Sequence, residues 1–498
     1  HSRISGIMSV RLAANSLSSL PGSVAVPRYD HSNLAAGIVH FGVGNFHRAH
    51  QAVYLDDLFN LGQDHDWGIV GAGVRANDAE MRKILAAQDY LSTVVEQEAS
   101  GTTARITGPM VDFLDPGDPA AIIAKLADPA IRIVSLTITE GGYYLDAAGN
   151  FNPNHPDIVA DAANPAAPRT VFGIILAGLK ARREAGVEPF TIMCCDNIPH
   201  NGKVTLNAVA GLAALFDSEM ADWVRRSVAF PNGMVDRITP ATSDRERAMV
   251  SDEYAISDAW PVFCETFRQW VLEDNFPSGR PALEKVGVTF VDDVSPWELM
   301  KIRILNGGHA AIAYPSALMD IHFVHEAMEH PLVAAYLEKL TRDEIIPVVP
   351  PVPDTDLDAY RRKCAQRFAN PRIGDTIQRL CLDGSNRQPK FILPSVEDRL
   401  NSGASITGLA LVSAFWCRYC YGVTDSGTPI APNDPNWDRL QAAAIRAKDD
   451  PKAFLEMKDI FGAAAEHPDY VAAFSNALGT IWEFGARDTL TRYIQGKL

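Results

Sequence analysis

Short runs of β-type residues alternate with helical patterns through the first half of the sequence, and this alternation constrains the fold more than any other feature. The β-type runs are 38–41, 67–70, 131–139 and 190–195, with helical patterns between them such as 120–126 and 170–183. Residues 131–139 are closer to a continuous apolar run than to strict alternation, as expected for a parallel strand buried on both faces. The pattern therefore predicts βαβ units and a parallel sheet.

The pattern changes near Ser295, where long helical segments separated by proline-rich breaks such as 347–353 begin. We expect an α/β Rossmann-type N-terminal domain with a mostly parallel sheet at 1–230 and a mainly α-helical C-terminal domain at 231–498. The β-type run 286–291 could return to the first domain. A length of 498 residues is compatible with two or three domains.

Charge and cysteine content exclude several classes of protein. The net charge of −16 with scattered basic residues argues against a nucleic-acid or anionic-membrane partner, and no apolar run is long enough for a membrane helix. Seven cysteines in such a long chain make a disulfide framework improbable and favour a reducing compartment. Residues 1–7, before Met8, lack the apolar stretch of a secretory signal, so we expect a cytoplasmic protein.

A glycine pair follows the first strand, where ligands of parallel sheets bind. Gly42 and Gly44 would let the backbone approach a pyrophosphate at the start of the next helical pattern, 51–60, although His47 stands in place of the third glycine of the usual motif. A plain tight turn is the alternative. The residues predicted to hold a dinucleotide here are Gly42, Gly44, Asn45, Phe46 and Arg48.

The second strand also ends in a glycine pair, and Asp78 lies shortly beyond it. An acidic side chain there accepts hydrogen bonds from the adenine-side ribose and repels the 2′-phosphate of NADP, so we expect NAD, with NADP less favoured. Asp78 could instead cap a helix, and Arg75 could bind a phosphate. Polar residues at two further strand ends, Thr139 with Glu140 and Asp196 with Asn197, are placed to meet the cofactor or substrate, although each alone would be an ordinary turn.

A polar face on one helix supplies the candidate chemistry. A helix is predicted to begin at Ser295, and at about 100° per residue Glu298, His309 and Asn306 fall about 60°, 80° and 140° from Lys301. Gly307 and Gly308 within this helix indicate a close approach by another group. A buried lysine can act as the base in alcohol oxidation, and asparagine amides can stabilise the alkoxide. A solvated helix face is the alternative.

Other devices for alcohol oxidation lack a plausible place in the sequence. The one Tyr-x-x-x-Lys pattern lies at 493–497, in the last turn of the chain, and there is no His-Glu-x-x-His pattern. We interpret His322, His325, His330 and Glu326 as residues of a surface helix and expect no metal site. Cys417 and Cys420 are interpreted as parts of a buried helix.

Five blocks of sequence resemble the polyol-specific long-chain dehydrogenases, and most closely their bacterial mannitol-oxidising members. They are FGVGNFHRAHQ at 41–51, SLTITEGGY at 135–143, CDNIPHNG at 195–202, MVDRITP at 234–240 and KIRILNGGH at 301–309. The resemblance runs from about residue 37 to the C-terminus. It implies a metal-independent, NAD(P)-linked oxidation of a polyol, with the Rossmann-type domain and the helical domain facing each other across a cleft.

The resemblance also implies roles for individual residues. Lys301 matches the general base, Asn197 and Asn306 match the amides that hold the alkoxide, and His309 matches a residue that orients the substrate oxygen. Glu298 matches a carboxylate associated with proton passage to solvent. The positions that resemble polyol contacts are Asp236, Arg379 and Arg387; relatives can carry lysine at the last of these, and Asn77 stands where they can carry a second acid.

Reversible oxidation of D-mannitol at C2 to D-fructose is the function that this resemblance implies, with a small polyol or ketose as the partner and a monomer as the expected state. The same chemistry on arabinitol, sorbitol or a hexuronate such as fructuronate is the alternative within the family. A protein that senses NAD without turnover is the alternative from a different class.

Overall fold

The computed structural model describes residues 8–498, so the prediction made for residues 1–7 lies outside the described residues. The chain folds into two compact units, one ending at Val294 and the other beginning at Ser295. Residues 231–294, expected in the helical domain, belong to the first unit. Their strands 256–257 and 262–265 pair with strands from earlier in the chain, and their other three strands pack on the central sheet of that unit. The change of pattern near Ser295, rather than residue 230, marks the division.

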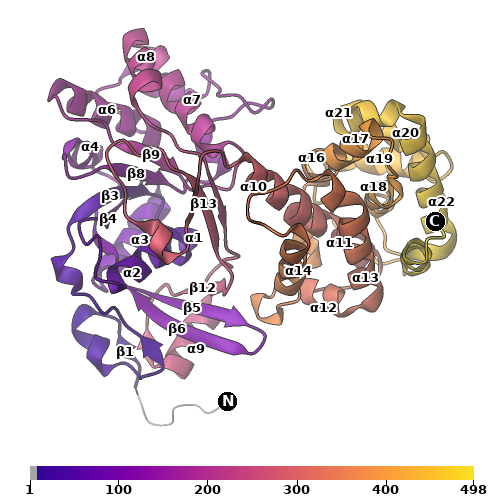
Figure 1. Ribbon diagram of the computed structural model, residues 1–498, viewed down its shortest axis with the longest axis horizontal. Helices are drawn as coiled ribbons and strands as arrows, with labels where there is room; N and C mark the ends of the chain where they lie inside the picture. Colours follow the sequence, from indigo (N-terminus) through magenta and orange to yellow (C-terminus); the bar gives the residue numbers. More distant parts are fainter. Residues whose placement is uncertain (1–7) are drawn as a thin grey trace. The chain divides into compact units, whose positions relative to one another are not determined.

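A five-stranded sheet in the order β7-β4-β3-β8-β9 forms the centre of the first unit, and all its strand pairs are parallel (Figure 1). The order reverses between β3 and β8, which creates the topological switch point where such sheets bind ligands. The expected parallel sheet is confirmed. Its strands are β3 (Ala36–Phe41), β4 (Gly68–Ala72), β7 (Met110–Phe113), β8 (Ile133–Leu136) and β9 (Thr191–Cys194).

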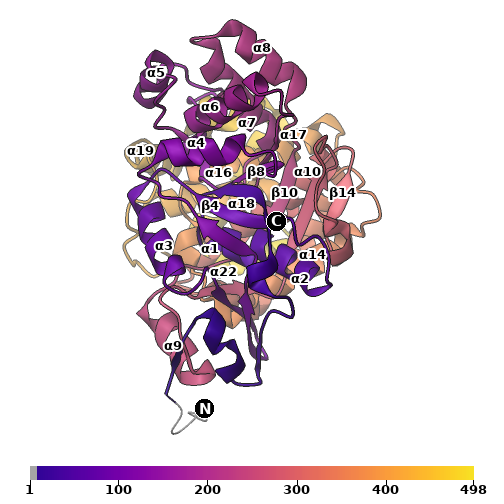
Figure 2. The ribbon, with the colours of Figure 1, turned by 90° about the vertical axis from the view of Figure 1, so that its left-hand side faces the viewer.

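Successive side chains of these strands enter two different cores, so the strands are buried on both faces. One core lies under helices α4 (Pro119–Ala127), α6 (Val171–Glu184), α7 (Asn201–Ala214) and α8 (Ser218–Ser227). Figure 2 shows α4 and α6 on the same side of β4 and β8. The other core lies under α2 (Gln51–Asn60) and a three-stranded sheet of β10 (Gly233–Asp236), β13 (Gln269–Glu273) and β14 (Thr289–Val291).

Several strands differ from the prediction. Residues 131–139 form a shorter strand, β8, and within 286–291 only β14 is extended, pairing with β13 in the first unit. A second sheet, in the order β12-β5-β6-β2, was not predicted, because polar residues interrupt its hairpin. Its strands are β2 (Val24–Ala25), β5 (Ser92–Glu98), β6 (Gly101–Thr107) and β12 (Val262–Glu265); β1 (Val10–Arg11) pairs with β11 (Ile256–Ser257). The other helices of this unit are α1 (Asn45–Ala49), α3 (Ala76–Ala86), α5 (Pro156–Ala163) and α9 (Asp244–Tyr254).

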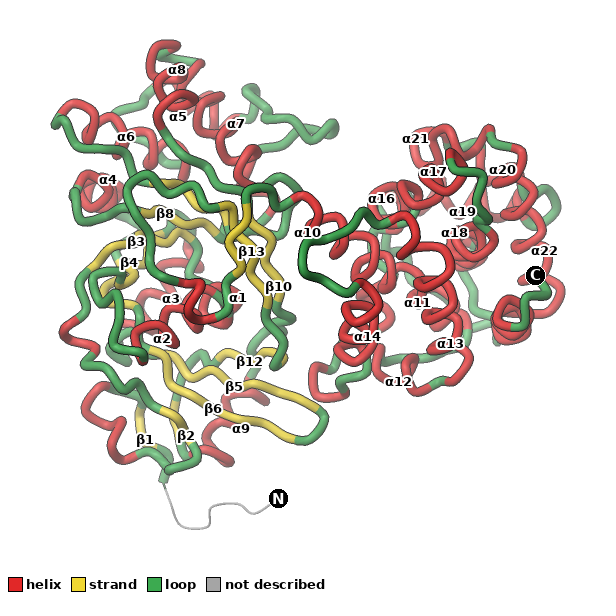
Figure 3. The backbone as a smooth tube through the Cα atoms, in the orientation of Figure 1, coloured by secondary structure: helices red, strands yellow, loops and turns green. Residues whose placement is uncertain are grey.

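Helices and loops make up the second unit, as expected (Figure 3). Its central helix is α18 (Thr407–Cys420), which is buried from Gly408 onward, contains Cys417 and Cys420, and packs against α11 and α22. No helix within 8–498 is long and apolar enough to cross a membrane. The remaining α-helices are α10 (Ser295–Met300), α11 (Gly307–Leu318), α12 (Val324–Glu329), α13 (Pro331–Leu340), α14 (Leu357–Phe368), α15 (Ile377–Leu380), α16 (Gly384–Phe391), α17 (Leu393–Asn401), α19 (Trp437–Ala447), α20 (Lys452–Leu455), α21 (Lys458–Phe461) and α22 (Pro468–Ile494).

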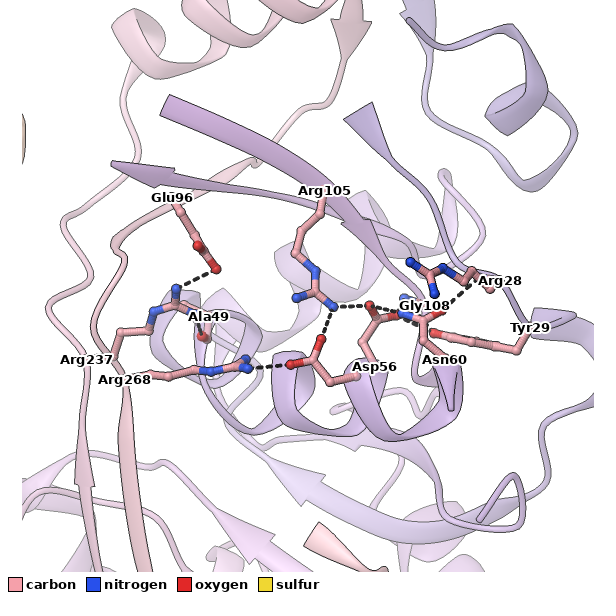
Figure 4. Close-up of polar contacts among 11 residues, drawn as sticks. Arg28, Tyr29, Ala49, Asp56, Asn60, Glu96, Arg105, Gly108, Arg237 and Arg268 are labelled. Carbon is pink, nitrogen blue, oxygen red and sulfur yellow. Dashed lines mark hydrogen bonds and ion pairs between the residues drawn. The ribbon is translucent and has the colours of Figure 1, made fainter. Parts of the chain in front are cut away.

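A network of acids and arginines joins α2 to the neighbouring sheets (Figure 4). Asp56 is 1% exposed and accepts hydrogen bonds from the Tyr29 hydroxyl at 2.6 Å and from the Gly108 N–H at 3.2 Å, and it pairs with Arg105 at 2.5 Å. Arg105 also reaches Asp57, which pairs in turn with Arg268. These contacts hold the helix that follows the glycine turn against β6 and β13.

Replacing Asp56 should therefore destabilise the first unit. In Asp56→Asn the partly buried Arg105 loses one of its two carboxylate partners and keeps Asp57, a change that should cost about 2 kcal/mol. We expect a Tm lower by at least about 5 °C in scanning calorimetry. The matched control is Asp66→Asn, whose carboxylate is 62% exposed and pairs with Arg132 at 3.4 Å, and which should change Tm by less than about 2 °C. Equal Tm values for the two variants would contradict this role for Asp56.

Candidate active site

The glycine turn after β3 is built on a backbone contact that excludes any side chain. Gly42 has a φ of +89°, and a Cβ there would lie 2.0 Å from the Thr137 carbonyl oxygen at the end of β8. The Thr137 hydroxyl donates to the Gly42 carbonyl at 2.6 Å. Gly44 by contrast has open space where a side chain would be, as a pyrophosphate site requires.

The His40 side chain stabilises this turn through hydrogen bonds to β8 and the residue that follows it. One of its ring nitrogens lies 2.8 Å from the Thr137 hydroxyl oxygen and the other lies 2.6 Å from the Ser135 hydroxyl oxygen. Because the Thr137 proton points to Gly42, His40 Nε2 donates to Thr137 and Nδ1 accepts from Ser135. Burial lowers the pKa of His40 to about 3, which keeps the ring neutral and this pattern intact.

A pocket of about 370 Å³ opens at the glycine turn, within the usual size range of ligand pockets. Gly42, Gly44, Asn45, Asp78 and Thr139, all predicted to bind the cofactor, line it. Further lining comes from the start of α3, from the segment after β8, and from a distant part of the chain. The residues concerned include Asn77, Met81, Ile84, Tyr144, Val171, Thr242 and Trp260.

Asp78 caps a helix and also lines the pocket. Its Oδ2 accepts hydrogen bonds from the backbone N–H groups of Val74 at 3.1 Å and Arg75 at 3.0 Å, which caps α3, and the residue also lines the pocket. A Cβ on Gly73 would lie 2.2 Å from the Asp78 carboxyl carbon, so the second glycine pair permits this close packing. Burial raises the pKa of Asp78 above its ordinary value, although these backbone donors oppose the shift.

Three of the predicted cofactor residues do not line the pocket. Arg48 is 2% exposed, and its guanidinium donates to the Trp260 carbonyl, the Ser92 hydroxyl and the Asn45 side chain. Phe46 stacks on His50 and packs in the core under α2. Glu140 is exposed at the start of the turn that follows Thr139. The contacts of Arg48 therefore brace the glycine turn through Asn45.

The helix that carries Lys301 departs from the expected geometry. Residues Lys301–Asn306 form a π-helix between α10 and α11, so the angles expected for a regular α-helix do not apply to them. In a π-helix the hydrogen bonds join residues five apart, which brings Lys301 and Asn306 onto adjacent turns on the same side. Segments of this kind occur frequently at functional sites. Lys301 is 6% exposed and Glu298, on α10, is 8% exposed.

His309 follows on α11 and lies in a cationic neighbourhood. Its ring stacks on Phe368 with centroids 4.1 Å apart, and Phe368 also approaches the backbone of Gly308, which explains that glycine. Burial lowers the pKa of His309 to about 3, and the charges of Arg379 and Arg387 act in the same direction. The fold thus brings His309 near both predicted polyol-binding arginines of this unit.

The two arginines differ in how they are held. Arg379 is 51% exposed on its side chain and pairs with Asp375 through two bonds of 2.5 and 2.6 Å. Arg387 donates to the carbonyls of Arg379 and Leu380, at 3.3 and 3.0 Å. In the first unit, Asp236 is 7% exposed at the end of β10, and Asn197 is exposed after the end of β9.

The parallel sheet, its glycine turn at the switch point and the pocket beside it define a Rossmann-type dinucleotide-binding protein. Comparison with known families is more specific. Residues 36–285 match the family described as the mannitol dehydrogenase Rossmann domain, and residues 293–482 match the mannitol dehydrogenase C-terminal domain. The chain belongs to the mannitol dehydrogenase family.

Similar proteins extend over nearly the whole chain. A mannitol 2-dehydrogenase of Cereibacter sphaeroides is 61% identical over 95% of this chain and 99% of its own length. The structure of Pseudomonas fluorescens mannitol 2-dehydrogenase in a ternary complex with NAD and D-mannitol matches with a TM-score of 0.84, at 44% identity, over 98% of this chain and 100% of that one. A substrate-free D-sorbitol dehydrogenase matches with a TM-score of 0.90, at 35% identity, over 96% and 100%.

Trp260 is a pocket residue that the sequence patterns did not indicate. Its indole N–H donates to Asn45 Oδ1 at 2.9 Å, and the Arg247 guanidinium lies 4.6 Å from its ring centroid. The Asn45 amide donates in turn to the Thr242 hydroxyl at 3.1 Å. More than 200 residues separate Trp260 from Asn45 in the chain, and no motif marks it. Only the folded chain places it beside the glycine turn.

Truncating Trp260 should weaken cofactor binding. Trp260→Leu removes an aromatic wall of the pocket and the donor that orients Asn45, so we expect the Kd for NADH to rise about tenfold. Trp260→Phe, which keeps a ring, should give a smaller rise. Fluorescence titration with NADH measures both. Trp223→Leu removes a tryptophan that instead packs with Arg183 and serves as the control. An unchanged Kd in Trp260→Leu would exclude Trp260 from the cofactor site.

The buried histidines predict how stability depends on pH. Burial lowers the pKa values of His40, His50 and His309 to about 3, whereas in the unfolded chain each binds a proton below about pH 6.5. The unfolded state therefore holds more protons between these values, and stability falls as the pH is lowered from about 6.5 toward 3. Tm measured from pH 7.5 to 4.5 should decline, and less steeply in His50→Gln. A Tm independent of pH would contradict the prediction.

Proposed function

We propose that this protein catalyses the reversible oxidation of D-mannitol at C2 to D-fructose, with NAD as the hydride acceptor. The observation that carries the proposal is the match, over nearly the full length of both chains, to a mannitol 2-dehydrogenase seen with NAD and D-mannitol. The pocket at the switch point fits the cofactor, since Gly44 leaves room for a pyrophosphate and Asp78 supplies a ribose acceptor that disfavours NADP.

Proton transfer is assigned to Lys301 and Glu298 of the second unit, and stabilisation of the alkoxide to two asparagines. Lys301 takes the proton of the C2 hydroxyl. NAD, when held at the glycine turn, would supply the acceptor for the hydride of the same carbon. Asn197 and Asn306 donate hydrogen bonds to the developing alkoxide. The π-helix supports the pairing of Lys301 with Asn306, because it sets their side chains on one side. Glu298 passes the proton from Lys301 to solvent.

Substrate recognition is assigned to His309 and three charged residues. His309 is neutral above about pH 4, because burial lowers its pKa to about 3, so its ring can orient the reacting oxygen without carrying a charge. Asp236, Arg379 and Arg387 contact the remaining polyol hydroxyls. A neutral polyol needs no electrostatic steering, so the net charge of −16 does not impede its capture.

Lys301→Ala should separate chemistry from cofactor binding. Loss of the base is expected to lower kcat about 100-fold or more, since general base catalysis contributes roughly that factor, while the Kd for NADH stays within about twofold. Stopped-flow turnover and NADH titration measure the two quantities. Near-normal turnover would refute Lys301 as the base.

Turnover should also survive exhaustive chelation, because the proposed scheme uses no metal. A loss of turnover that zinc reverses would refute the metal-independent scheme.

D-Sorbitol is the second candidate substrate, favoured by the match to D-sorbitol dehydrogenase. A panel of mannitol, sorbitol, arabinitol, fructose and fructuronate, read by NADH absorbance, separates the candidates. We expect the highest kcat/KM for mannitol and fructose. Fructuronate as the best substrate would indicate that Arg379 and Arg387 bind a carboxylate. Absence of turnover with every compound would favour a protein that senses NAD.

The cellular setting and the assembly state are part of the proposal. The seven cysteines are free and buried, which supports a reducing compartment and thus the cytoplasm. We propose a monomer that acts on small molecules alone, without a nucleic-acid or membrane partner. A stable dimer in sedimentation would overturn the monomer.

A further inference from the structure

Thr139, at the edge of the cofactor pocket, has a backbone conformation that side chains rarely adopt. Its φ is +65° and its ψ is 163°, a region populated almost only by glycine. The residue is exposed and lines the pocket just beyond the end of β8. Such a conformation persists only where surrounding contacts enforce it.

Asp196, which follows β9, makes the contacts that enforce it. One carboxylate oxygen accepts the backbone N–H of Thr139 at 3.0 Å, and the other accepts the backbone N–H of Ile138 at 2.9 Å and the hydroxyl of Tyr143. The carboxylate therefore accepts hydrogen bonds from both ends of the segment 138–143. Burial raises the pKa of Asp196, and its hydrogen-bond donors oppose that rise.

The backbone of Asp196 is itself fixed. The fully buried Asn201 donates through its amide nitrogen to the carbonyls of Cys194 and Asp196, both at 3.2 Å, and its amide oxygen accepts the Gly233 N–H at 2.9 Å. The Asp196 carbonyl belongs to the peptide that leads into Asn197. The chain is therefore held immediately before the proposed alkoxide-binding amide.

We propose that Asp196 is a positioning residue that locks Thr139 of the cofactor pocket and its own neighbour Asn197 into a single arrangement across the ends of β8 and β9. It touches neither cofactor nor substrate in this scheme and acts through those two residues. The part that concerns Asn197 rests on the proposed function. The part that concerns Thr139 and the pocket does not.

Rescue by glycine is the decisive test. Asp196→Ala removes the carboxylate, so Thr139 should relax from its conformation, with an expected rise of about tenfold in the Kd for NADH and a fall of about 100-fold in kcat. Glycine adopts this backbone without strain, so the double variant Asp196→Ala/Thr139→Gly should regain most of the NADH affinity. Asp196→Ala/Thr139→Ala loses the same hydroxyl but retains a Cβ, and should regain none.

Glu344→Ala is the matched control. Glu344 is a buried acid of the second unit that accepts the backbone N–H groups of Gly408 and Leu409, at 2.7 and 3.1 Å, and the Tyr493 hydroxyl, and neither it nor these partners line the pocket. Its removal should lower Tm and leave the Kd for NADH unchanged. An equal effect of Glu344→Ala on NADH binding would reduce Asp196 to a general stabiliser and overturn the proposal.

Two further outcomes would count against Asp196. Equal NADH affinity in the glycine and alanine double variants overturns the proposal, as does an unchanged Kd in Asp196→Ala. If Asp196→Ala does not fold, Asp196→Asn replaces it. The asparagine NH2 group cannot accept a hydrogen bond, so one of the two backbone N–H groups loses its acceptor and a smaller rise in the Kd for NADH is expected. No rise in this Kd overturns the proposal. NADH binding is measured without polyol, so a failure of the proposed function to appear in turnover is a separate result.

Discussion

The contact between Gly42 and the Thr137 carbonyl is the constraint on which the rest of the first unit depends. It joins the ends of β3 and β8 at the point where the strand order reverses, and it leaves no space for a Cβ. The Thr137 hydroxyl and the neutral His40 ring complete the junction. Everything that lines the pocket is positioned relative to this turn, because the turn fixes where the backbone can meet a phosphate.

Residues outside the central sheet also form part of the pocket. Trp260 and Thr242 come from segments beside the second sheet, and both reach the glycine turn through the Asn45 side chain. Arg48, which was predicted to bind the cofactor, instead donates hydrogen bonds to Asn45 and to the Trp260 carbonyl. A side chain next to a glycine motif can therefore hold neighbouring residues of the site in place rather than bind the ligand.

Much of this arrangement could be predicted from local patterns. The strands β3, β4 and β9, the helix α2 and the glycine turns follow from apolar runs and glycine spacing, which depend only on neighbouring residues. The hairpin of β5 and β6 could not be predicted in this way, since polar residues such as Glu96 and Gln97 lie within it and its stability comes from pairing with β12 and β2. The domain division was misplaced for the same reason: β10, β13 and β14 belong to the first unit through long-range packing on its central sheet.

The sequence by itself determined the alternating α/β architecture, the two glycine turns, the position of Asp78 and the family to which the chain belongs, because each is written in residues close together in the chain. The tertiary structure alone decided that Lys301–Asn306 is π-helical, that Trp260 walls the pocket, and that Asp196 holds Thr139 in a glycine-like conformation. These features arise where packing and hydrogen bonds between distant segments outweigh the local preference of the backbone.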